Sequence, residues 1–223
     1  MSAAPDADPL QPVLLHADAQ LLVYAKPAGL LSVPGIGPDK QDCLRVRAQQ
    51  QWPDAMIVHR LDMATSGLIL MARGQEMQKT LSMAFEKRRM HKRYQAVVLG
   101  EPLPVPDAHG WSRIQLPMRI DYQNRPRSII DFARGKPSLT RWQRLGAGPW
   151  PDTTRLLLEP MTGRTHQLRV HLLAIGHPIV GDPLYAPVEV PPRAPRLLLH
   201  ATELAFEHPV TGQACRFVAP VPF

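Results

Sequence analysis

The segment HRLDMATSGL, residues 59–68, places the carboxylate of Asp62 in a polar loop that leads into an apolar run at 68–71. A short apolar run of this kind predicts a buried strand, so the loop before it is an unusual place for a charge. Asp62 either caps the turn through backbone amides or acts as a catalytic carboxylate. This segment alone does not decide between the two interpretations.

The composition indicates a folded protein with a polyanionic partner. The chain has 223 residues, of which 44% are hydrophobic and 20% charged, which argues against disorder. Its 25 prolines favour short strands and rigid connections over a helical bundle. Lys and Arg number 26 against 19 Asp and Glu, a net charge of +7, and an excess of this sign favours nucleic acid as the partner.

The sequence predicts no membrane segment, no disulfide framework and no structural zinc site. No apolar run approaches the roughly 18 residues that a membrane helix needs, so we expect a cytoplasmic protein. Cys43 and Cys215 stand alone, without a C-x-x-C motif. Neither a P-loop nor a G-x-G-x-x-G motif is present, and we expect no cofactor.

Strand patterns outnumber helix patterns along the chain. Helices are expected at 41–52, at 74–90 with a basic run at 87–93 as its end, and at 165–176, with Thr165 as the N-cap and Gly176 as the end. Strands are expected at 21–24, 68–71, 94–99, 113–120, 128–132, 140–145 and 154–158, and a C-terminal hairpin turns at 211–212. Residues 182–195 are expected to form a proline-rich extended loop.

Arg169 is a candidate partner for a carboxylate. On the expected helix it lies at the margin of the face that carries Leu172, and Arg164 precedes the same helix. An arginine paired with a carboxylate would lower the pKa of that carboxylate and hold it ionised, as a nucleophile or base requires. A purely structural ion pair fits the pattern equally well.

The histidines and Ser66 give only weak indications of other chemistry. His166 and His171 are five residues apart, whereas zinc-binding histidines on a helix are spaced i, i+4, so we expect no metal site. Ser66 lacks the G-x-S-x-G context of a hydrolase nucleophile.

Basic residues gather in segments that suit an RNA backbone. The run at 87–93 directly precedes Tyr94, and the segment 124–127 with Arg134 and Lys136 adds further charge. Together they would form a phosphate-binding surface beside an aromatic ring that can stack on a base. A solvated helix end and an ordinary strand tyrosine are the plain alternatives.

Residues 59–68 resemble the signature loop of the RluA family of pseudouridine synthases, H-R-L-D-x-x-T-S-G. Further segments resemble other blocks of that family, in the same order: 26–35, 91–100, 160–185 and 197–212. The resemblance runs from about residue 19 to the C-terminus. It is closest to the short branch without an S4-like RNA-binding domain, because about 18 residues precede the first block, and the stretch at 121–126 also fits that branch.

The resemblance implies an α+β fold: a mixed, largely antiparallel sheet with flanking helices and a central catalytic cleft. It divides the chain into a flexible leader at 1–18 and a catalytic domain at 19–223. The segment 101–110 and the insertion near Gly148 match no family block, and substrate choice is expected to lie there.

The activity implied is the isomerisation of uridine to pseudouridine in RNA, without cofactor or metal. Asp62 would be the essential carboxylate, acting either as a nucleophile at C1′ or as a base at C2′. Tyr94 would stack on the uracil, Arg169 would pair with Asp62, Leu199 would pack against the base, and Arg60 would fill the space left by the flipped nucleotide. Supporting or RNA-binding roles are expected for Lys26, Lys87, Arg88, Lys92, Arg125 and Arg164.

The expected substrates are a tRNA anticodon stem-loop, a 23S rRNA hairpin loop, or both, and the expected state is a monomer. Two other hypotheses make different forecasts. A non-catalytic RNA-binding or RNA-folding protein on the same scaffold would not need the intact set of Asp62, Tyr94 and Arg169. A metal-dependent hydrolase built on the histidines would be inhibited by chelators.

Overall fold

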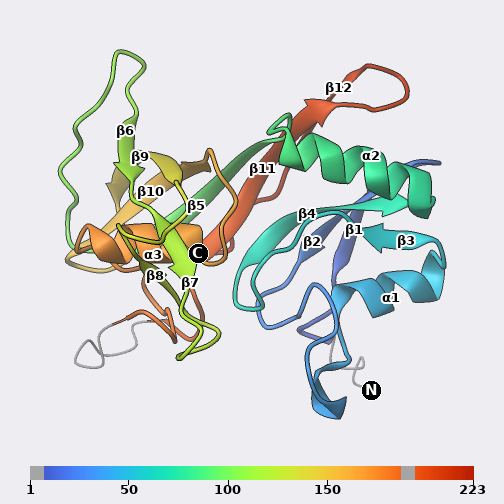
Figure 1. Cartoon of the computed structure of the whole chain (residues 1–223), viewed down its shortest axis with the longest axis horizontal. Coiled ribbons are helices and arrows are strands. Elements are labelled where there is room, and N and C mark those ends of the chain that lie inside the picture. Colours follow the sequence, from blue (N-terminus) through green and yellow to red (C-terminus); the bar gives the residue numbers. More distant parts are fainter. Residues whose placement is uncertain (1–7, 187–193) are drawn as a thin grey trace, which may run out of the picture. The chain divides into compact units, whose positions relative to one another are not determined.

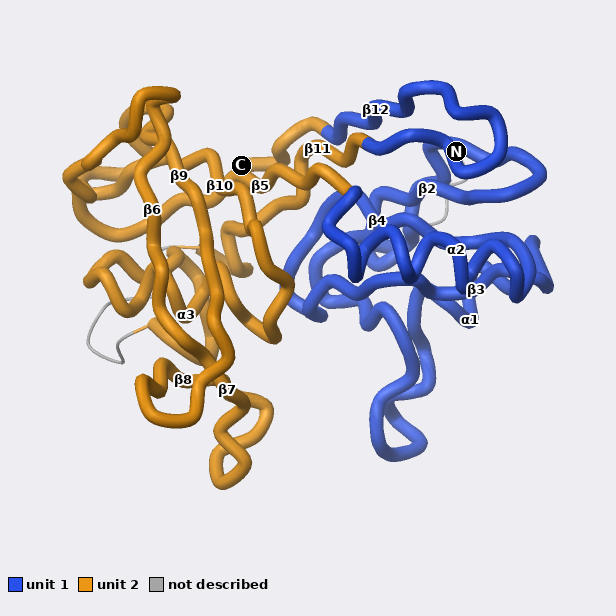
Figure 2. Tube along the Cα trace, turned by 45° about the horizontal axis from the view of Figure 1, so that its top comes forward, with its two compact units in different colours: residues 1–89, 206–219 blue, residues 90–205, 220–223 orange. Residues whose placement is uncertain are grey.

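The computed structural model describes residues 8–186 and 194–223, and they form two compact units (Figures 1 and 2). Unit 1 comprises residues 1–89 and 206–219, and unit 2 comprises 90–205 and 220–223. Each unit contains strands and at least one helix, in agreement with the expected α+β class. Among the described residues, no helix is long and apolar enough to cross a membrane.

Unit 1 is built around a buried strand. Its elements are β1 (Val13–Ala17), β2 (Leu21–Lys26), the 3-10 helix η1 (Pro38–Lys40), α1 (Leu44–Gln51), β3 (Ala55–Ile57), β4 (Ser66–Arg73), α2 (Gly74–Glu86) and β12 (Ala214–Val218). β4 pairs with β2 and with β3, both antiparallel, and β1 pairs with β2. Seven of the eight β4 residues are buried, because neighbouring elements, α2 among them, cover this strand.

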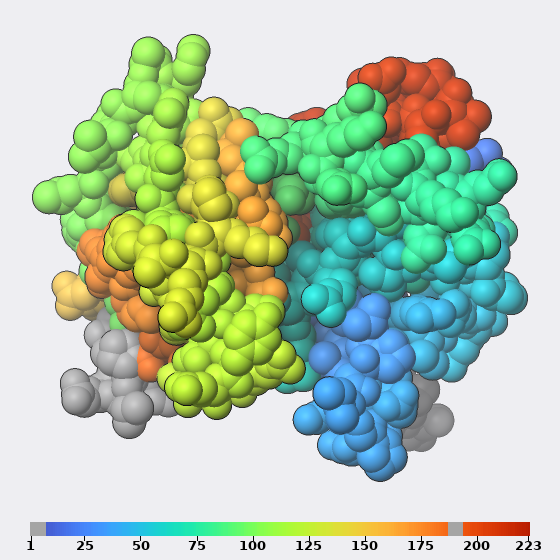
Figure 3. All heavy atoms as spheres, in the orientation of Figure 1, coloured from blue at the N-terminus to red at the C-terminus, as the bar shows by residue number. Residues whose placement is uncertain are grey.

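Unit 2 contains five strands that pair in the order β11, β5, β10, β9, β6, each antiparallel to its neighbour. Its elements are β5 (His91–Leu99), β6 (Ser112–Gln115), β7 (Met118–Ile120), β8 (Ser128–Ile130), β9 (Leu139–Ala147), β10 (Thr153–Pro160), α3 (Gln167–Ala174) and β11 (Leu199–Glu207). β7 and β8 form a separate hairpin, visible on the face displayed in Figure 3. A small core of Met118, Val170 and Tyr185 joins this hairpin to α3.

Most of the expected elements are confirmed, and the differences have local causes. The leader expected at 1–18 is wrong over Val13–Ala17, where β1 pairs with β2. β1 carries a short apolar run at residues 13–15, but its residues are exposed or half-buried, so this run does not mark a buried strand. The strand expected at 113–120 is split into β6 and β7 around Pro117, whose missing N–H cannot join the ladder.

Two helix boundaries also differ from the expectation. α2 ends at Glu86, and the last part of the basic run, from His91, belongs to β5 instead. The N-cap of α3 is His166 rather than Thr165, and His166 has a left-handed backbone with a φ of 58°. Parts of the leader and of the proline-rich loop, 1–7 and 187–193, lie outside the described residues.

Candidate active site

Asp62 lies half-buried in the turn that leads into β4. The turn is closed by a hydrogen bond from the Thr65 N–H to the Asp62 carbonyl oxygen (3.0 Å). Thr65 and the first residues of β4 are buried. The carboxylate is therefore placed on a turn whose backbone is held at the end of a rigid strand, which is what a reacting group requires.

A second loop, residues 27–32, fixes the backbone on either side of Asp62. The Ser32 hydroxyl donates to the Leu61 carbonyl oxygen (2.7 Å) and accepts from the Leu61 N–H (3.2 Å). The Gly29 N–H donates to the Met63 carbonyl oxygen at 2.8 Å. Gly29 has a φ of +92°, which a glycine adopts without strain.

Lys26 reinforces the same arrangement from the end of β2. Its side chain is buried, with 1% of the residue exposed. The ammonium donates to the carbonyl oxygens of Pro27 (2.8 Å), Leu30 (2.8 Å) and Met63 (3.2 Å). These contacts join the loop at 27–30 to the turn that carries Asp62, and the supporting role expected for Lys26 stays a prediction.

His59 connects the turn that carries Asp62 to β4 and α2. Its Nε2 accepts the N–H of Leu70 at 2.9 Å, and its ring stacks on Phe85 with centroids 4.3 Å apart. This imidazole has a structural function. Among the described residues, no group of three or more His, Cys, Asp or Glu side chains is arranged to hold a metal ion.

Tyr94 and Leu199 share one face of the unit 2 sheet. In the β5–β11 ladder Tyr94 pairs with Ala201, and Leu199 pairs with Ala96. Directly opposed residues project to the same side of an antiparallel pair, and so do residues two positions apart. The two side chains expected to enclose the uracil are therefore diagonal neighbours on one surface.

α3 lies over this same face. Tyr94 is opposite Leu158 in β10, and Leu158 is opposite Trp142 in β9. Thr140, two residues from Trp142, projects to the same side, and its hydroxyl forms a hydrogen bond of 2.9 Å with Nδ1 of His171 in α3. The helix that carries the candidate arginine thus covers the face of the candidate stacking residues.

Arg169 is buried in α3 and paired with an aspartate that the sequence analysis did not single out. Only 2% of Arg169 is exposed. Its Nε and Nη2 donate to the two carboxylate oxygens of Asp182, at 2.8 and 2.7 Å. The expected pairing of Arg169 with Asp62 stays a prediction.

The candidate RNA-binding residues differ in exposure. Arg60, Lys87, Arg88, Arg125 and Arg164 are exposed, whereas Lys92 is half-buried. Burial lowers the pKa of the Lys92 ammonium. The guanidinium of Arg125 lies 4.8 Å from the ring centre of Tyr122, an exposed aromatic residue in the loop between β7 and β8.

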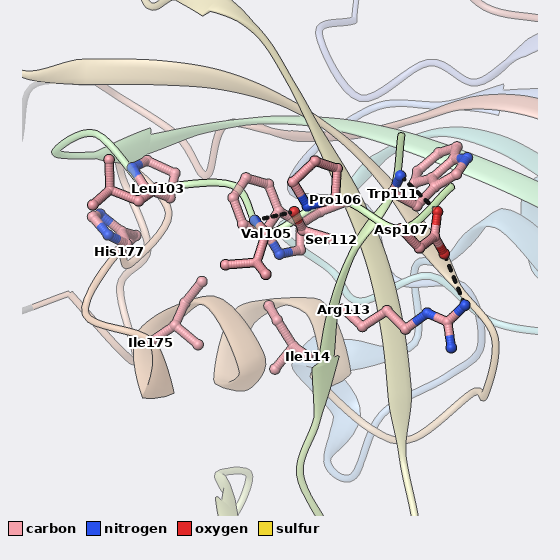
Figure 4. Close-up of a pocket in the computed structure, with 12 residues that line it drawn as sticks. Leu103, Val105, Pro106, Asp107, Trp111, Ser112, Arg113, Ile114, Ile175 and His177 are labelled. Carbon is pink, nitrogen blue, oxygen red and sulfur yellow. Dashed lines mark hydrogen bonds and ion pairs between the residues drawn. The ribbon is translucent and has the colours of Figure 1, made fainter. Parts of the chain in front are cut away.

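Unit 2 also has an open, largely apolar pocket of about 500 Å³ (Figure 4). Its lining comes from residues 102–114 with Trp142, Ile175 and His177. An ion pair between Asp107 and Arg113 (2.8 Å) lies among these residues. No candidate catalytic or RNA-binding residue lines the pocket, although much of the unmatched segment 101–110 does.

A pH effect on stability is expected from His171, which is fully buried. Burial lowers the pKa of this imidazole below 6.5, and its hydrogen bond to the Leu116 carbonyl oxygen only partly opposes that. Below about pH 6.5 the His171 imidazole therefore binds a proton more readily in the unfolded chain than in the folded chain, so acid favours unfolding. We expect Tm to fall between pH 7.5 and 5.5, and we expect a smaller fall in His171→Gln.

Thermal unfolding followed by circular dichroism at several pH values checks this prediction. His109→Gln, at an exposed position in the same unit, serves as the control and should keep the wild-type acid dependence. An unchanged decline in His171→Gln would show that other groups cause the loss.

Comparison with known proteins identifies the family. The family model for RNA pseudouridylate synthase matches residues 20–174. The chain belongs to the RNA pseudouridine synthase family. It is 44% identical over 223 residues to the dual-specificity RNA pseudouridine synthase RluA of Pasteurella multocida, covering all of this chain and 99% of that protein. Identity to the RluA of Escherichia coli strain K12 is also 44%, over 95% of this chain and 94% of that protein.

Solved structures agree with this family assignment. Human RNA pseudouridylate synthase domain containing 1 superposes with a TM-score of 0.78 at 28% identity, covering 99% of this chain and 87% of that one. Human RNA pseudouridylate synthase domain containing 4 gives a TM-score of 0.71 at 23% identity and shows the shared fold alone. The chain is therefore an RNA-modifying isomerase with the pseudouridine synthase fold.

The residues that hold the candidate groups in place were not predictable from the sequence. Ser32 and Asp182 stand inside matched blocks, yet neither carries a pattern that reveals its partner. Their partners are 29 and 13 residues away in the chain, so only the fold brings them together.

Proposed function

We propose that this protein converts specific uridines in RNA to pseudouridine, with Asp62 as the essential carboxylate. In the reaction the bond between N1 and C1′ breaks and a bond between C5 and C1′ forms. The C5 proton is lost and N1 gains a proton, so no atom is added overall and no redox partner is needed. The observation that carries the proposal is the family match over residues 20–174, which includes the complete Asp62 motif.

Two roles for Asp62 fit this reaction. As a nucleophile at C1′ it would form a covalent sugar adduct as the uracil leaves, and C5 of the rotated uracil would displace the carboxylate. As a base it would remove the C2′ proton and give a glycal, to which the proton returns when C5 bonds to C1′. The turn held by Ser32 and Lys26 supports either role, since both need a fixed carboxylate.

The remaining candidate residues are assigned roles on the same reaction. We assign Tyr94 and Leu199 to packing against the uracil, which their shared sheet face supports. In our scheme Tyr94 also assists removal of the C5 proton, Arg169 orients Asp62, and exposed Arg60 occupies the space of the flipped nucleotide. Flipping costs a few kcal/mol and least in a loop, so a hairpin-loop uridine is the favoured target.

The substrates proposed are a tRNA anticodon stem-loop and a 23S rRNA hairpin loop. The support is the 44% identity to relatives that are named dual-specificity RNA pseudouridine synthases. A monomeric state and a cytoplasmic location are further predictions, checked by light scattering and by cell fractionation.

Mapping of new pseudouridines tests the proposed specificity. Purified protein is incubated without metal or ATP with total RNA from a strain that lacks pseudouridine at the candidate sites, and modified positions are read by chemical sequencing. New pseudouridines in both an anticodon loop and a 23S hairpin support dual specificity. Modification of one RNA class alone overturns it, and binding without any modification favours a non-catalytic RNA-binding protein.

Lys87 and Arg88 provide a separate test of the RNA surface. Both are exposed, and Arg88 has a φ of 56°, so Lys87→Ala is combined with Arg88→Asn, because Asn tolerates this conformation. Loss of two phosphate contacts should reduce the slope of log K against log salt by about 1.4, with kcat at saturating RNA unchanged.

Fluorescence anisotropy over a salt series measures this slope. The matched control removes two other exposed charges of unit 1, in Lys40→Ala with Lys79→Ala. An equal reduction in both double variants would mean that only net charge matters and would place Lys87 and Arg88 outside the interface.

A further inference from the structure

The pair of Arg169 and Asp182 is the most enclosed ion pair among the described residues of unit 2. The two residues are 2% and 3% exposed. Both carboxylate oxygens accept from the guanidinium, at 2.8 Å from Nε and 2.7 Å from Nη2. A bidentate contact of this kind fixes the plane of the guanidinium as well as its position.

Asp182 is itself held rigidly. Its Oδ1 also accepts the N–H groups of Leu184 (2.9 Å) and Tyr185 (3.1 Å). Directly before it, Gly181 has a φ of +73°, and a Cβ there would lie 2.0 Å from the Arg196 carbonyl oxygen. Only glycine fits at position 181, so close packing against the Arg196 backbone fixes the start of the turn.

Tyr185 supports the guanidinium from a second direction. Its ring centre lies 5.0 Å from the Cζ atom of Arg169, within the range of a cation–π contact. The phenol oxygen accepts the Ser128 N–H (2.8 Å) and forms a hydrogen bond with Nδ1 of His166 (2.7 Å). The ring is thereby anchored to β8 and to the start of α3.

We propose that Asp182 is a positioning residue for the isomerisation, acting through Arg169. Asp182 engages two of the five guanidinium N–H donors, on the edge formed by Nε and Nη2. The other N–H groups of the Arg169 guanidinium are then held in fixed directions, which suits them to orient a second carboxylate. The proposal rests on the proposed function, in which that carboxylate is Asp62.

The expected consequence is a loss in kcat rather than in RNA affinity. In Asp182→Asn an NH2 group replaces one of the two carboxylate oxygens and opposes one of the two guanidinium donors, so the bidentate contact is lost and the guanidinium shifts. A displacement of about 1 Å in a reacting group typically costs about 100-fold in rate, and we expect a loss of about that size in kcat. Asp182 is buried, so KM for RNA should stay within about twofold.

A double-mutant cycle with Arg169→Lys separates this role from a purely structural one. Lysine keeps the charge but has no planar fork, so kcat should already be low in Arg169→Lys. If Asp182 acts only through Arg169, adding Asp182→Asn lowers kcat by less than about threefold more. An equal loss in both backgrounds overturns the proposal, as does wild-type kcat in Asp182→Asn or in Arg169→Lys.

Asp131→Asn is the matched control. Asp131 also accepts two backbone N–H groups, of Ala133 and Arg134, and pairs with an arginine, Arg119, in the same unit. We expect wild-type kcat in this variant, and a loss as large as that of Asp182→Asn would mean that removing any such aspartate disturbs the fold.

Asp182→Glu covers the case in which Asp182→Asn does not fold. It keeps the charge and displaces the guanidinium by one methylene, so a positioning role predicts a lower kcat with unchanged KM, whereas wild-type kcat overturns it. Failure of the proposed function itself is distinguishable, because the wild-type protein would then form no pseudouridine.

Discussion

Asp62→Asn is expected to abolish pseudouridine formation while the protein still folds and binds RNA. The amide cannot attack C1′ or remove a C2′ proton, so we expect activity to fall by at least about 10³-fold. The turn should persist, because hydrogen bonds to backbone atoms of Leu61, Asp62 and Met63 hold it.

Single-turnover assays and RNA-binding measurements on the same preparation check this prediction. Asp39→Asn, an exposed aspartate of the same unit, is the control and should keep full activity. Retained activity in Asp62→Asn would remove Asp62 from the reaction. Loss of RNA binding together with activity would instead point to damage of the whole loop.

Lys26→Met is expected to reduce both stability and activity. The change removes the donor shared by the carbonyl oxygens of Pro27, Leu30 and Met63. Leaving these buried carbonyl oxygens without a donor destabilises the folded state, and removal of the buried charge offsets part of that loss. We therefore expect the free energy of unfolding to fall by about 2 kcal/mol. The turn at Asp62 then loosens, and kcat should fall by about 10-fold or more.

Urea unfolding and steady-state kinetics measure the two effects. Lys79→Met, at an exposed position of α2, should change the free energy of unfolding by no more than about 0.5 kcal/mol and leave kcat unaltered. A Lys26→Met protein with normal kcat would show that the Asp62 turn keeps its geometry without the ammonium.

Residues that follow a local pattern were predictable from the sequence. The apolar stripe of α2 and the buried run of β4 gave the correct element types. Burial on one face of a helix leaves apolar residues at helical spacing, and burial on both faces of a strand leaves a continuous apolar run. The candidate carboxylate, Asp62, stood out because a charge preceded a buried strand. The family resemblance supplied the reaction, which no pattern of residue types contains.

Features that depend on distant contacts were not predictable. The left-handed His166 caps α3 where its ring bonds to Tyr185, 19 residues away, so Thr165 appeared the better cap. Asp182 looked like a loop residue, although the fold makes it the buried partner of Arg169. β1 was overlooked because its apolar run is only three residues long, and its pairing with β2 depends on a contact that the local pattern does not reveal.

Release of tritium from RNA labelled at C5 of uridine tests the central claim most directly. The C5 proton leaves when C5 bonds to C1′, so each pseudouridine formed releases one label to water. We predict that the wild-type protein, without metal or ATP, releases tritium in proportion to the target sites and that Asp62→Asn releases none. Equal release by both proteins, or RNA binding without release by the wild type, would contradict the account.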